Sequence, residues 1–162
     1  MARSKPEPSP EEAAARRARY DELVAEEVLR PMDYFKHDAD AHADPKLCDL
    51  RDIAGMEGFG RYWLLVEVLA GREGHAYEVE DRATGRDRWR RFAAELECDG
   101  GVAEAKSFVA ALEELGLIDS ELLHERGKVG IERLARNAYE MAEATAARKL
   151  GAWAKHERSR AI

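Results

Sequence analysis

Residues 86–131 read RDRWRRFAAELECDGGVAEAKSFVAALEELGLIDSELLHERGKVGI, and this stretch decides the fold. Apolar residues recur at helical spacing over residues 86–97 and again over residues 102–115. The residues CDGG at 98–101 predict a tight turn between the two segments. The stretch therefore predicts a helix-turn-helix.

A small β wing is expected after the second of these helices. Residues 117–119 predict a strand, residues 125–128 a basic turn, and residues 129–131 a returning strand. Arg126 and Lys128 then lie at the tip of the wing. The predicted fold class is mainly α with a small β wing, a winged helix-turn-helix with N- and C-terminal helical extensions.

The rest of the chain also predicts helices. Ser9-Pro10-Glu11-Glu12 has the pattern of a capping box and predicts a helix that runs to about Arg30 and is stopped by Pro31. Asp44-Pro45 starts the next helix, with Leu47, Leu50 and Ile53 inward and Gly55 at its end. A core helix over 57–70, a strand over 75–80 and a long helix from Glu132 towards Trp153 follow, whereas residues 1–8 predict disorder. The expected parts are an arm at 1–31, a winged-helix core at 32–131 and a basic C-terminal helix and tail at 132–162.

Composition narrows the class of protein. The 162 residues suit one compact domain with extensions, and no stretch is long and apolar enough to cross a membrane. Cys48 and Cys98 lie far apart and predict small reduced core residues of a cytoplasmic protein. The net charge is −7, yet residues 126–162 carry nine basic and four acidic side chains.

The second helix of the helix-turn-helix indicates a DNA-binding surface. At 100° per residue, Ala103, Lys106, Ser107 and Ala110 lie opposite the core-facing residues, and small side chains with a lysine and a hydroxyl suit a major groove. Arginines on the preceding helix suit contacts to phosphates. The predicted DNA-binding residues are Arg88, Arg90, Arg91, Lys106, Ser107, Arg126 and Lys128.

Two other classes of function stay open. Residues 31–125 carry 22 acidic and 11 basic side chains, which favours a protein–protein interaction module without direct DNA binding. A metal site is the third, because His37–Asp44 on a strand would present three carboxylates and an imidazole on one face. Asp44 is already the expected helix cap, so we predict no metal site. No Ser–His–Asp order is recognisable, so we predict no catalytic residue, no cofactor and no enzyme.

Several segments resemble the N-terminal domain of the Lin1244/Lin1753-like family, which occurs in phage-type and mobile-element proteins. The similar segments are Tyr34–Leu47, Leu50-Arg51, Gly55–Trp63, Glu67–Leu69, Leu112–Ile118 and Gly130–Leu134. The resemblance implies a helical, winged-helix-like module related to phage replisome organisers, which binds DNA at a replication origin or fork. It also implies replication proteins as partners, and supplies no catalytic residues. The arm before this region is an addition to the family pattern, and the chain ends shortly after it.

The arm also bears on the oligomeric state. Its apolar residues lie in the second half of the predicted helix, so it needs a surface to pack on. That surface belongs either to the same chain or to a second copy, and we expect a homodimer through the arm.

Overall fold

The computed structural model describes residues 9–160, with side chains described up to Trp153. The predicted disorder of residues 1–8 lies outside the described residues. The chain divides into two compact units. Unit 1 is made of the chain up to Leu29 and the chain from Tyr139 onward, and unit 2 spans Arg30–Ala138.

Helix α1 (Pro10–Glu27) begins as its sequence predicts. The Ser9 hydroxyl accepts a hydrogen bond from the Glu12 amide at 3.2 Å, and the Glu12 carboxylate accepts from the Ser9 amide at 2.8 Å. This confirms the capping box, which satisfies two amides that a helix start leaves without partners.

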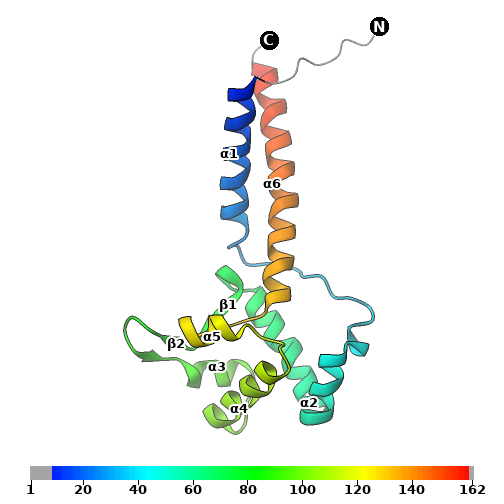
Figure 1. Cartoon of the computed structure of the whole chain (residues 1–162), viewed down its shortest axis with the longest axis vertical. Helices are drawn as coiled ribbons and strands as arrows, with labels where there is room; N and C mark the ends of the chain where they lie inside the picture. Colours follow the sequence, from blue (N-terminus) through cyan, green and yellow to red (C-terminus); the bar gives the residue numbers. More distant parts are fainter. Residues whose placement is uncertain (1–8, 161–162) are drawn as a thin grey trace. The chain divides into compact units, whose positions relative to one another are not determined.

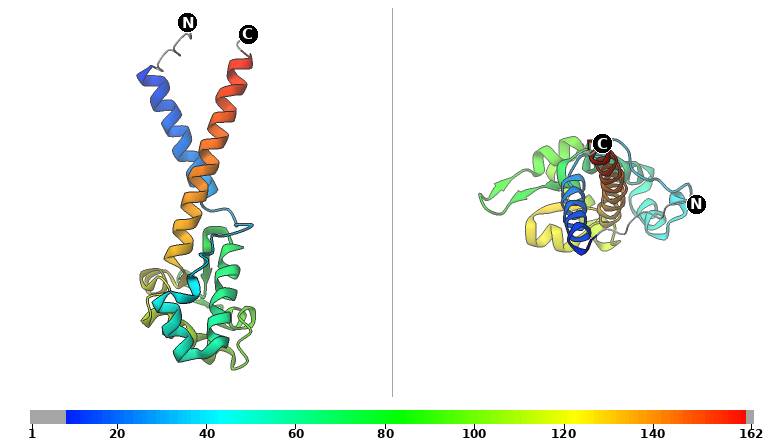
Figure 2. Two further views of the ribbon diagram at one scale, coloured as in Figure 1. Left: turned by 90° about the vertical axis from the view of Figure 1, so that its right-hand side faces the viewer. Right: turned by 90° about the horizontal axis from the view of Figure 1, so that it is seen from above.

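Unit 1 pairs α1 with the part of α6 (Glu132–Arg160) that follows Ala138. Figure 1 shows the two helices side by side, and Figure 2 shows that they diverge towards the ends of the chain. Leu23 and Val24 are buried against Ala142 and Ala146, whereas residues 10–19 of α1 are exposed. The second half of the arm therefore packs on its own chain, and the homodimer stays a prediction.

Unit 2 starts from α2 (Pro45–Ala70), which follows a 3-10 turn η1 (Ala41–Ala43). Asp44 caps α2 by accepting from the amides of Lys46 at 2.9 Å and Leu47 at 3.3 Å, as expected. The expected break at Gly55 is a kink within one helical run, where φ is +66°. The inward placement of Ile53 was wrong, since its side chain is 64% exposed. Three residues along a helix rotate the side-chain direction by 300°, which is 60° short of a full turn. After two such steps from Leu47, Ile53 no longer points towards the core.

A hairpin that the sequence reading missed follows α2. After the short turn η2 (Glu73–His75) come β1 (Ala76–Glu78), β2 (Glu80–Asp81) and β3 (Arg86–Asp87), with β2 and β3 antiparallel. The Asp81 carboxylate accepts from the amides of Ala83 and Thr84 and from the Thr84 hydroxyl at 2.6 Å. This turn folds residues 86–87 into a strand, so the predicted helix over 86–97 begins only at Trp89.

The helix-turn-helix itself is present. Helix α3 (Trp89–Glu95) and helix α4 (Gly101–Glu114) pack on each other around Phe92, Ala105 and Leu112, which are fully buried. Cys98 in the connecting turn is buried as expected, and Cys48 on α2 is half-buried. Among the described helices, none combines the length and apolar character needed to cross a membrane.

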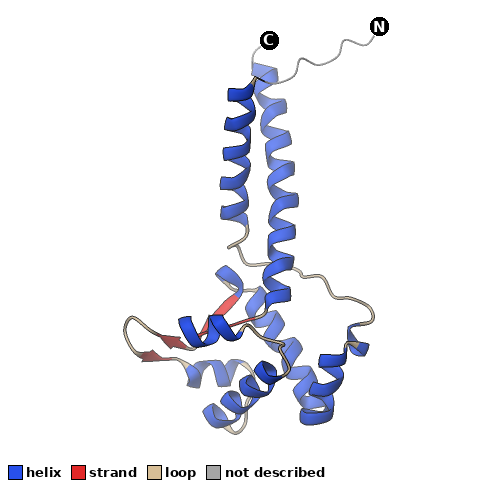
Figure 3. Ribbon diagram, viewed as in Figure 1, coloured by secondary structure: helices blue, strands red, loops and turns tan. Residues whose placement is uncertain are grey.

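Of the predicted wing over residues 117–131, the returning strand is present as β4 (Lys128–Gly130), but the first strand and the turn are not. Residues Ser120–Arg126 form a helix, α5, because the Asp119 carboxylate accepts from the Leu122 amide at 2.9 Å and caps it. Strand β4 (Lys128–Gly130) pairs antiparallel with β1. The hairpin that takes the place of the wing is β2–β3, and Figure 3 shows it standing out beside α3 and α5. The fold class predicted from the sequence, mainly α with a small β wing, is confirmed.

One buried arginine joins α2 to the helix-turn-helix. The Arg61 side chain is 11% exposed and its guanidinium pairs with Glu57 and with Glu104 on α4, both at 2.7 Å. It also donates to the carbonyls of Leu96 at 3.2 Å and Glu97 at 3.4 Å, at the end of α3. These contacts satisfy carbonyl groups that a helix end leaves without partners.

We expect Arg61→Met to lower the free energy of unfolding by about 2–3 kcal/mol, because it leaves the carboxylate of Glu104 and two carbonyls without a largely buried partner, whereas Glu57 is 78% exposed and is hydrated instead. Urea unfolding followed by circular dichroism measures the loss. Arg91→Met is the matched control, since its pair with Glu95 is 78% exposed on the arginine side and should be worth about 0.5 kcal/mol. Equal losses in both variants would contradict the role given to Arg61.

Gly127 makes a second testable contact, where the end of α5 meets the start of β2. Its φ is +63°, and a Cβ there would lie 2.3 Å from the Glu80 carbonyl oxygen. Gly116 has a similar φ of +61°, but a Cβ there meets only the flexible end of Lys46 at 3.1 Å. We expect Gly116→Ala to cost about 1–2 kcal/mol for the left-handed backbone alone. Gly127→Ala should cost at least about 2 kcal/mol more because backbone must also move. Similar unfolding midpoints for the two variants would refute the close approach.

Candidate nucleic-acid interface

The exposed face of α4 matches the sequence prediction. Ala103, Lys106, Ser107 and Ala110 are all exposed, and Ala105, Phe108, Val109 and Leu112 on the opposite face are buried. Phe108 packs below the Arg61 guanidinium, which lies 5.7 Å from its ring centroid. The core therefore fixes which side of α4 faces the solvent.

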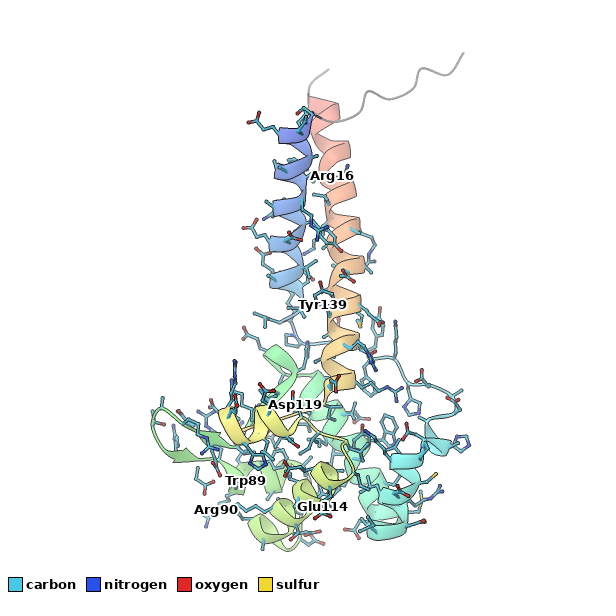
Figure 4. The ribbon with its side chains drawn as sticks, viewed as in Figure 1. Arg16, Trp89, Arg90, Glu114, Asp119 and Tyr139 are labelled. Atoms are coloured by element: carbon cyan, nitrogen blue, oxygen red, sulfur yellow. The ribbon has the colours of Figure 1, made fainter. Side chains whose placement is uncertain are left out.

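Trp89 places Lys106 next to the start of α3. The Lys106 ammonium lies 5.3 Å from the centroid of the Trp89 ring, and Trp89 is itself buried. The indole nitrogen of Trp89 donates to Glu80 on β2 at 3.2 Å. One buried ring thus connects the hairpin, α3 and the lysine of α4, and Figure 4 shows Trp89 with Arg90 beside it.

Glu104 and Glu113, two of the three acids of α4, are held by other residues, whereas Glu114 at the end of the helix is exposed. Glu104 accepts from the Gly100 amide at 2.7 Å and pairs with Arg61, and these contacts lower the pKa of its carboxyl. Hydrogen bonds from Ser120 and then from His124 lower the pKa of Glu113, with His124 Nε2 at 2.6 Å. The charges of Glu104 and Glu113 therefore have donors within the chain and are partly offset where they border the exposed face.

The three predicted arginines near α3 differ in whether a carboxylate within the chain offsets their charge. Arg88 lies outside α3, as the residue before its first turn, and pairs with Glu78 at 2.7 Å. Arg91 pairs with Glu95 at 3.1 Å. Arg90 is exposed and forms no ion pair with any described residue. Of the three, only Arg90 presents a charge that no carboxylate in the described part of the chain offsets.

Glu95 accepts hydrogen bonds from several side chains near this surface. Its carboxylate accepts from Arg72, from the Tyr77 hydroxyl at 3.0 Å and from Arg91. Burial opposes ionisation of Glu95, but the hydrogen bonds from Arg72 and Tyr77 outweigh it and lower the pKa of the carboxyl. The Glu95 carboxylate therefore offsets part of the positive charge of Arg72 and Arg91.

Arg126 and Lys128 do not lie at a wing tip, and that part of the prediction was wrong. Arg126 is exposed in the last turn of α5, and Lys128 is half-buried in β4 opposite Glu78. The helix capped by Asp119 takes up the residues that the predicted wing needed. The tip of the observed hairpin instead carries Arg82, which pairs with Glu80 at 3.3 Å.

Arg86 is the residue of this surface that the predicted list missed. It is exposed on β3, opposite Asp81 in the hairpin register, and it forms no ion pair among the described residues. The sequence has five arginines between positions 82 and 91, and Arg86 is one of them, but the helix predicted over 86–97 did not indicate its place on a hairpin. With Arg90 and Lys106 it gives three exposed cations, which we call the α3–α4 cation set.

The segment His37–Asp44 does not form the strand on which the metal alternative depended. It consists of a turn followed by η1. The His37 ring lies 4.2 Å from the Trp63 ring, Asp38 pairs with Arg133, and Asp44 caps α2. Among the described residues, the structure brings no three His, Cys, Asp or Glu side chains together in an arrangement that could hold a metal ion.

Comparison with known proteins gives one match. Residues 34–129, more than half of the chain, match the family described as Lin1244/Lin1753-like, N-terminal. No curated protein and no solved structure matches this chain. The matched range begins before η1 and ends within β4, so it includes the helix-turn-helix and the hairpin. The chain therefore belongs to the Lin1244/Lin1753-like N-terminal domain family.

Proposed function

We propose that the protein binds duplex DNA through the exposed face of α4 and the α3–α4 cation set, within the cytoplasm. The observation that carries this proposal is that Arg86 on β3, Arg90 on α3 and Lys106 on α4 are exposed cations, and that α4 also exposes the small residues Ala103, Ser107 and Ala110. Small side chains allow α4 to approach base edges closely, and Lys106 and Ser107 supply donors there. Arg86 and Arg90 then contact phosphates on either side.

The pairing of Glu104 and Glu113 supports the same surface. A free carboxylate beside a phosphate would oppose binding, but both acids already accept hydrogen bonds from groups in the chain. Charges on a surface act over about 8 Å at physiological salt, so the local cations matter more than the net charge of −7. Arg88 and Arg91 contribute less, since Glu78 and Glu95 offset them.

The biological role that we infer is DNA replication of a phage or mobile element. It rests on the resemblance to phage replisome organisers, and it includes replication proteins as further partners. A homodimer would present two copies of α4 to one duplex, as many helix-turn-helix proteins do. Sedimentation of the purified protein tests the dimer.

We expect the salt dependence of binding to report two phosphate contacts, from Arg86 and Arg90. For two contacts, the affinity for random duplex DNA should fall about 12-fold between 50 and 200 mM salt. In Arg90→Gln the fall should shrink to about 3.5-fold, because one contact is lost. Fluorescence anisotropy at several salt concentrations measures both slopes.

Arg91→Gln is the control, on the same helix and next to Arg90. Glu95 lies 3.1 Å from Arg91, so this substitution should change the slope by less than half as much. Lys106→Gln should weaken binding and also reduce any preference for one sequence. Absence of binding at 50 mM salt, or a slope that Arg90→Gln leaves unchanged, would overturn the proposal.

A protein–protein interaction module is the alternative that one observation favours. Residues 31–125 carry twice as many acidic as basic side chains, which suits a basic protein partner better than a polyanion. If the anisotropy experiment shows no DNA binding, a pull-down after nuclease treatment tests this alternative.

A further inference from the structure

Unit 2 contains a polar pocket that takes no part in the proposed DNA contact. Its volume is about 220 Å³. It lies where three segments meet: the start of α2, the residues that follow α4, and the start of α6. Its polar side chains come from Asp44, Lys46, Tyr62, Glu132, Arg133 and Arg136.

Three cationic side chains lie in the wall of this pocket. The Lys46 ammonium donates one hydrogen bond to the Gly116 carbonyl at 2.7 Å and keeps two more donors. Arg133 pairs with Asp38, which holds its guanidinium in the wall. Arg136 is exposed and forms no ion pair with any residue of the described chain. The pocket thus contains donors that the protein itself does not satisfy.

The acids in the wall offset these charges only in part. The Asp44 carboxylate already accepts hydrogen bonds from the amides of Lys46 and Leu47, at the positive end of α2. Glu132 is exposed in the first turn of α6. The start of α6 also lines the pocket, and the amides of a first helical turn attract negative charge.

Tyr62 is the independent observation that points to a ligand. The residue is only 5% exposed, yet its hydroxyl forms no hydrogen bond with any described residue. Burial raises the pKa of this hydroxyl, Arg133 opposes that shift, and Asp44 adds to it. Both of those charges line the pocket, so the hydroxyl lies at its wall. The hydroxyl is not among the fully buried unpaired atoms of the described residues, so it opens to the pocket and can donate to a polar ligand there.

We propose that this pocket binds the phosphate group of a phosphomonoester, with Lys46, Arg136 and the Tyr62 hydroxyl as donors. A volume of about 220 Å³ accommodates a phosphate with a small part of its substituent and is too small for most whole ligands. The same chemistry is offered by the 5′-phosphate end of a DNA strand and by a free phosphorylated metabolite. The site is separate from the α3–α4 cation set and does not depend on it.

The experiment titrates inorganic phosphate into the full chain at constant ionic strength, with amide chemical shifts as the readout. We expect saturable shifts of the amides of Lys46, Gly116 and Arg133, with a dissociation constant of about 1 mM or below. Tyr62→Phe and Arg136→Gln should each weaken binding about 10-fold, because each removes one donor to a charged ligand. Glu132→Gln should tighten it, since it removes a like charge.

Arg90→Gln is the matched control and should leave phosphate affinity unchanged, while Arg136→Gln should leave the salt slope of duplex binding unchanged. This keeps a failure of the pocket distinct from a failure of the proposed DNA surface. Shifts that do not saturate by about 20 mM phosphate, or that fall on α3 and α4 instead, would overturn the proposal. The three pocket variants, Tyr62→Phe, Arg136→Gln and Glu132→Gln, keep the wild-type amide spectrum outside the pocket if they fold normally.

A second arm identifies the source of the phosphate. A single strand with a 5′-phosphate is compared with the same strand without it, and with glycerol phosphate. Tighter binding of the phosphorylated strand at the pocket amides assigns the site to DNA ends. Equal binding of glycerol phosphate and the phosphorylated strand assigns it to free monoesters, and loss of the phosphate effect in both would contradict the pocket altogether.

Discussion

The buried guanidinium of Arg61 is the interaction on which the DNA-facing surface depends. It reaches from α2 to the last carbonyls of α3 and to Glu104 on α4, and its side chain is 11% exposed. A guanidinium presents five donors in a fixed plane, so several partners at once restrict the orientation of every element they belong to. The turn between α3 and α4 is short, and Glu97 within it has a φ of +53°. Donors at the end of α3 help to hold that uncommon backbone, and with it the direction in which α4 leaves the turn.

The same contact also shapes the charge of the surface. Arg61 pairs with Glu104, so the charge of this acid on the flank of α4 is offset within the fold. His124 does the same for Glu113 from α5. The exposed face of α4 therefore carries small side chains and Lys106, with the exposed Glu114 at its C-terminal end. A fold can provide such a face without basic composition, because each charge acts mainly on its near neighbours at physiological salt.

How much the sequence could predict follows from the distance between interacting residues. The caps at Ser9 and Asp44, the turn at 98–101 and the exposed face of α4 depend on residues within one or two helical turns, and these were readable. The Arg91–Glu95 pair also has helical spacing and could have been read. The pairing of β1 with β4 joins residues about fifty positions apart, and the Arg61–Glu104 pair joins two separate helices. No local pattern in one sequence encodes such contacts.

The misplaced wing shows how two local signals can compete. Leu117-Ile118-Asp119 suits a strand, but Asp119 also suits a helix cap, and the second role prevails because its carboxylate reaches the Leu122 amide. The missed hairpin has the same origin, since Asp81 forms a side-chain turn within residues that were expected to lead into a helix.

The two groups of cations differ in the shape of the surface that carries them. Arg86, Arg90 and Lys106 are exposed, so an extended polyanion can contact them and water screens each contact. Lys46, Arg133 and Arg136 line a hollow beyond the other end of α4, together with the Tyr62 hydroxyl. A hollow lets a few donors reach one compact anion from several sides, so they can select it by geometry. The exposed cations therefore suit a long, repetitive ligand that is recognised by many weak contacts, and the hollow suits a single phosphate that is recognised by a few strong ones.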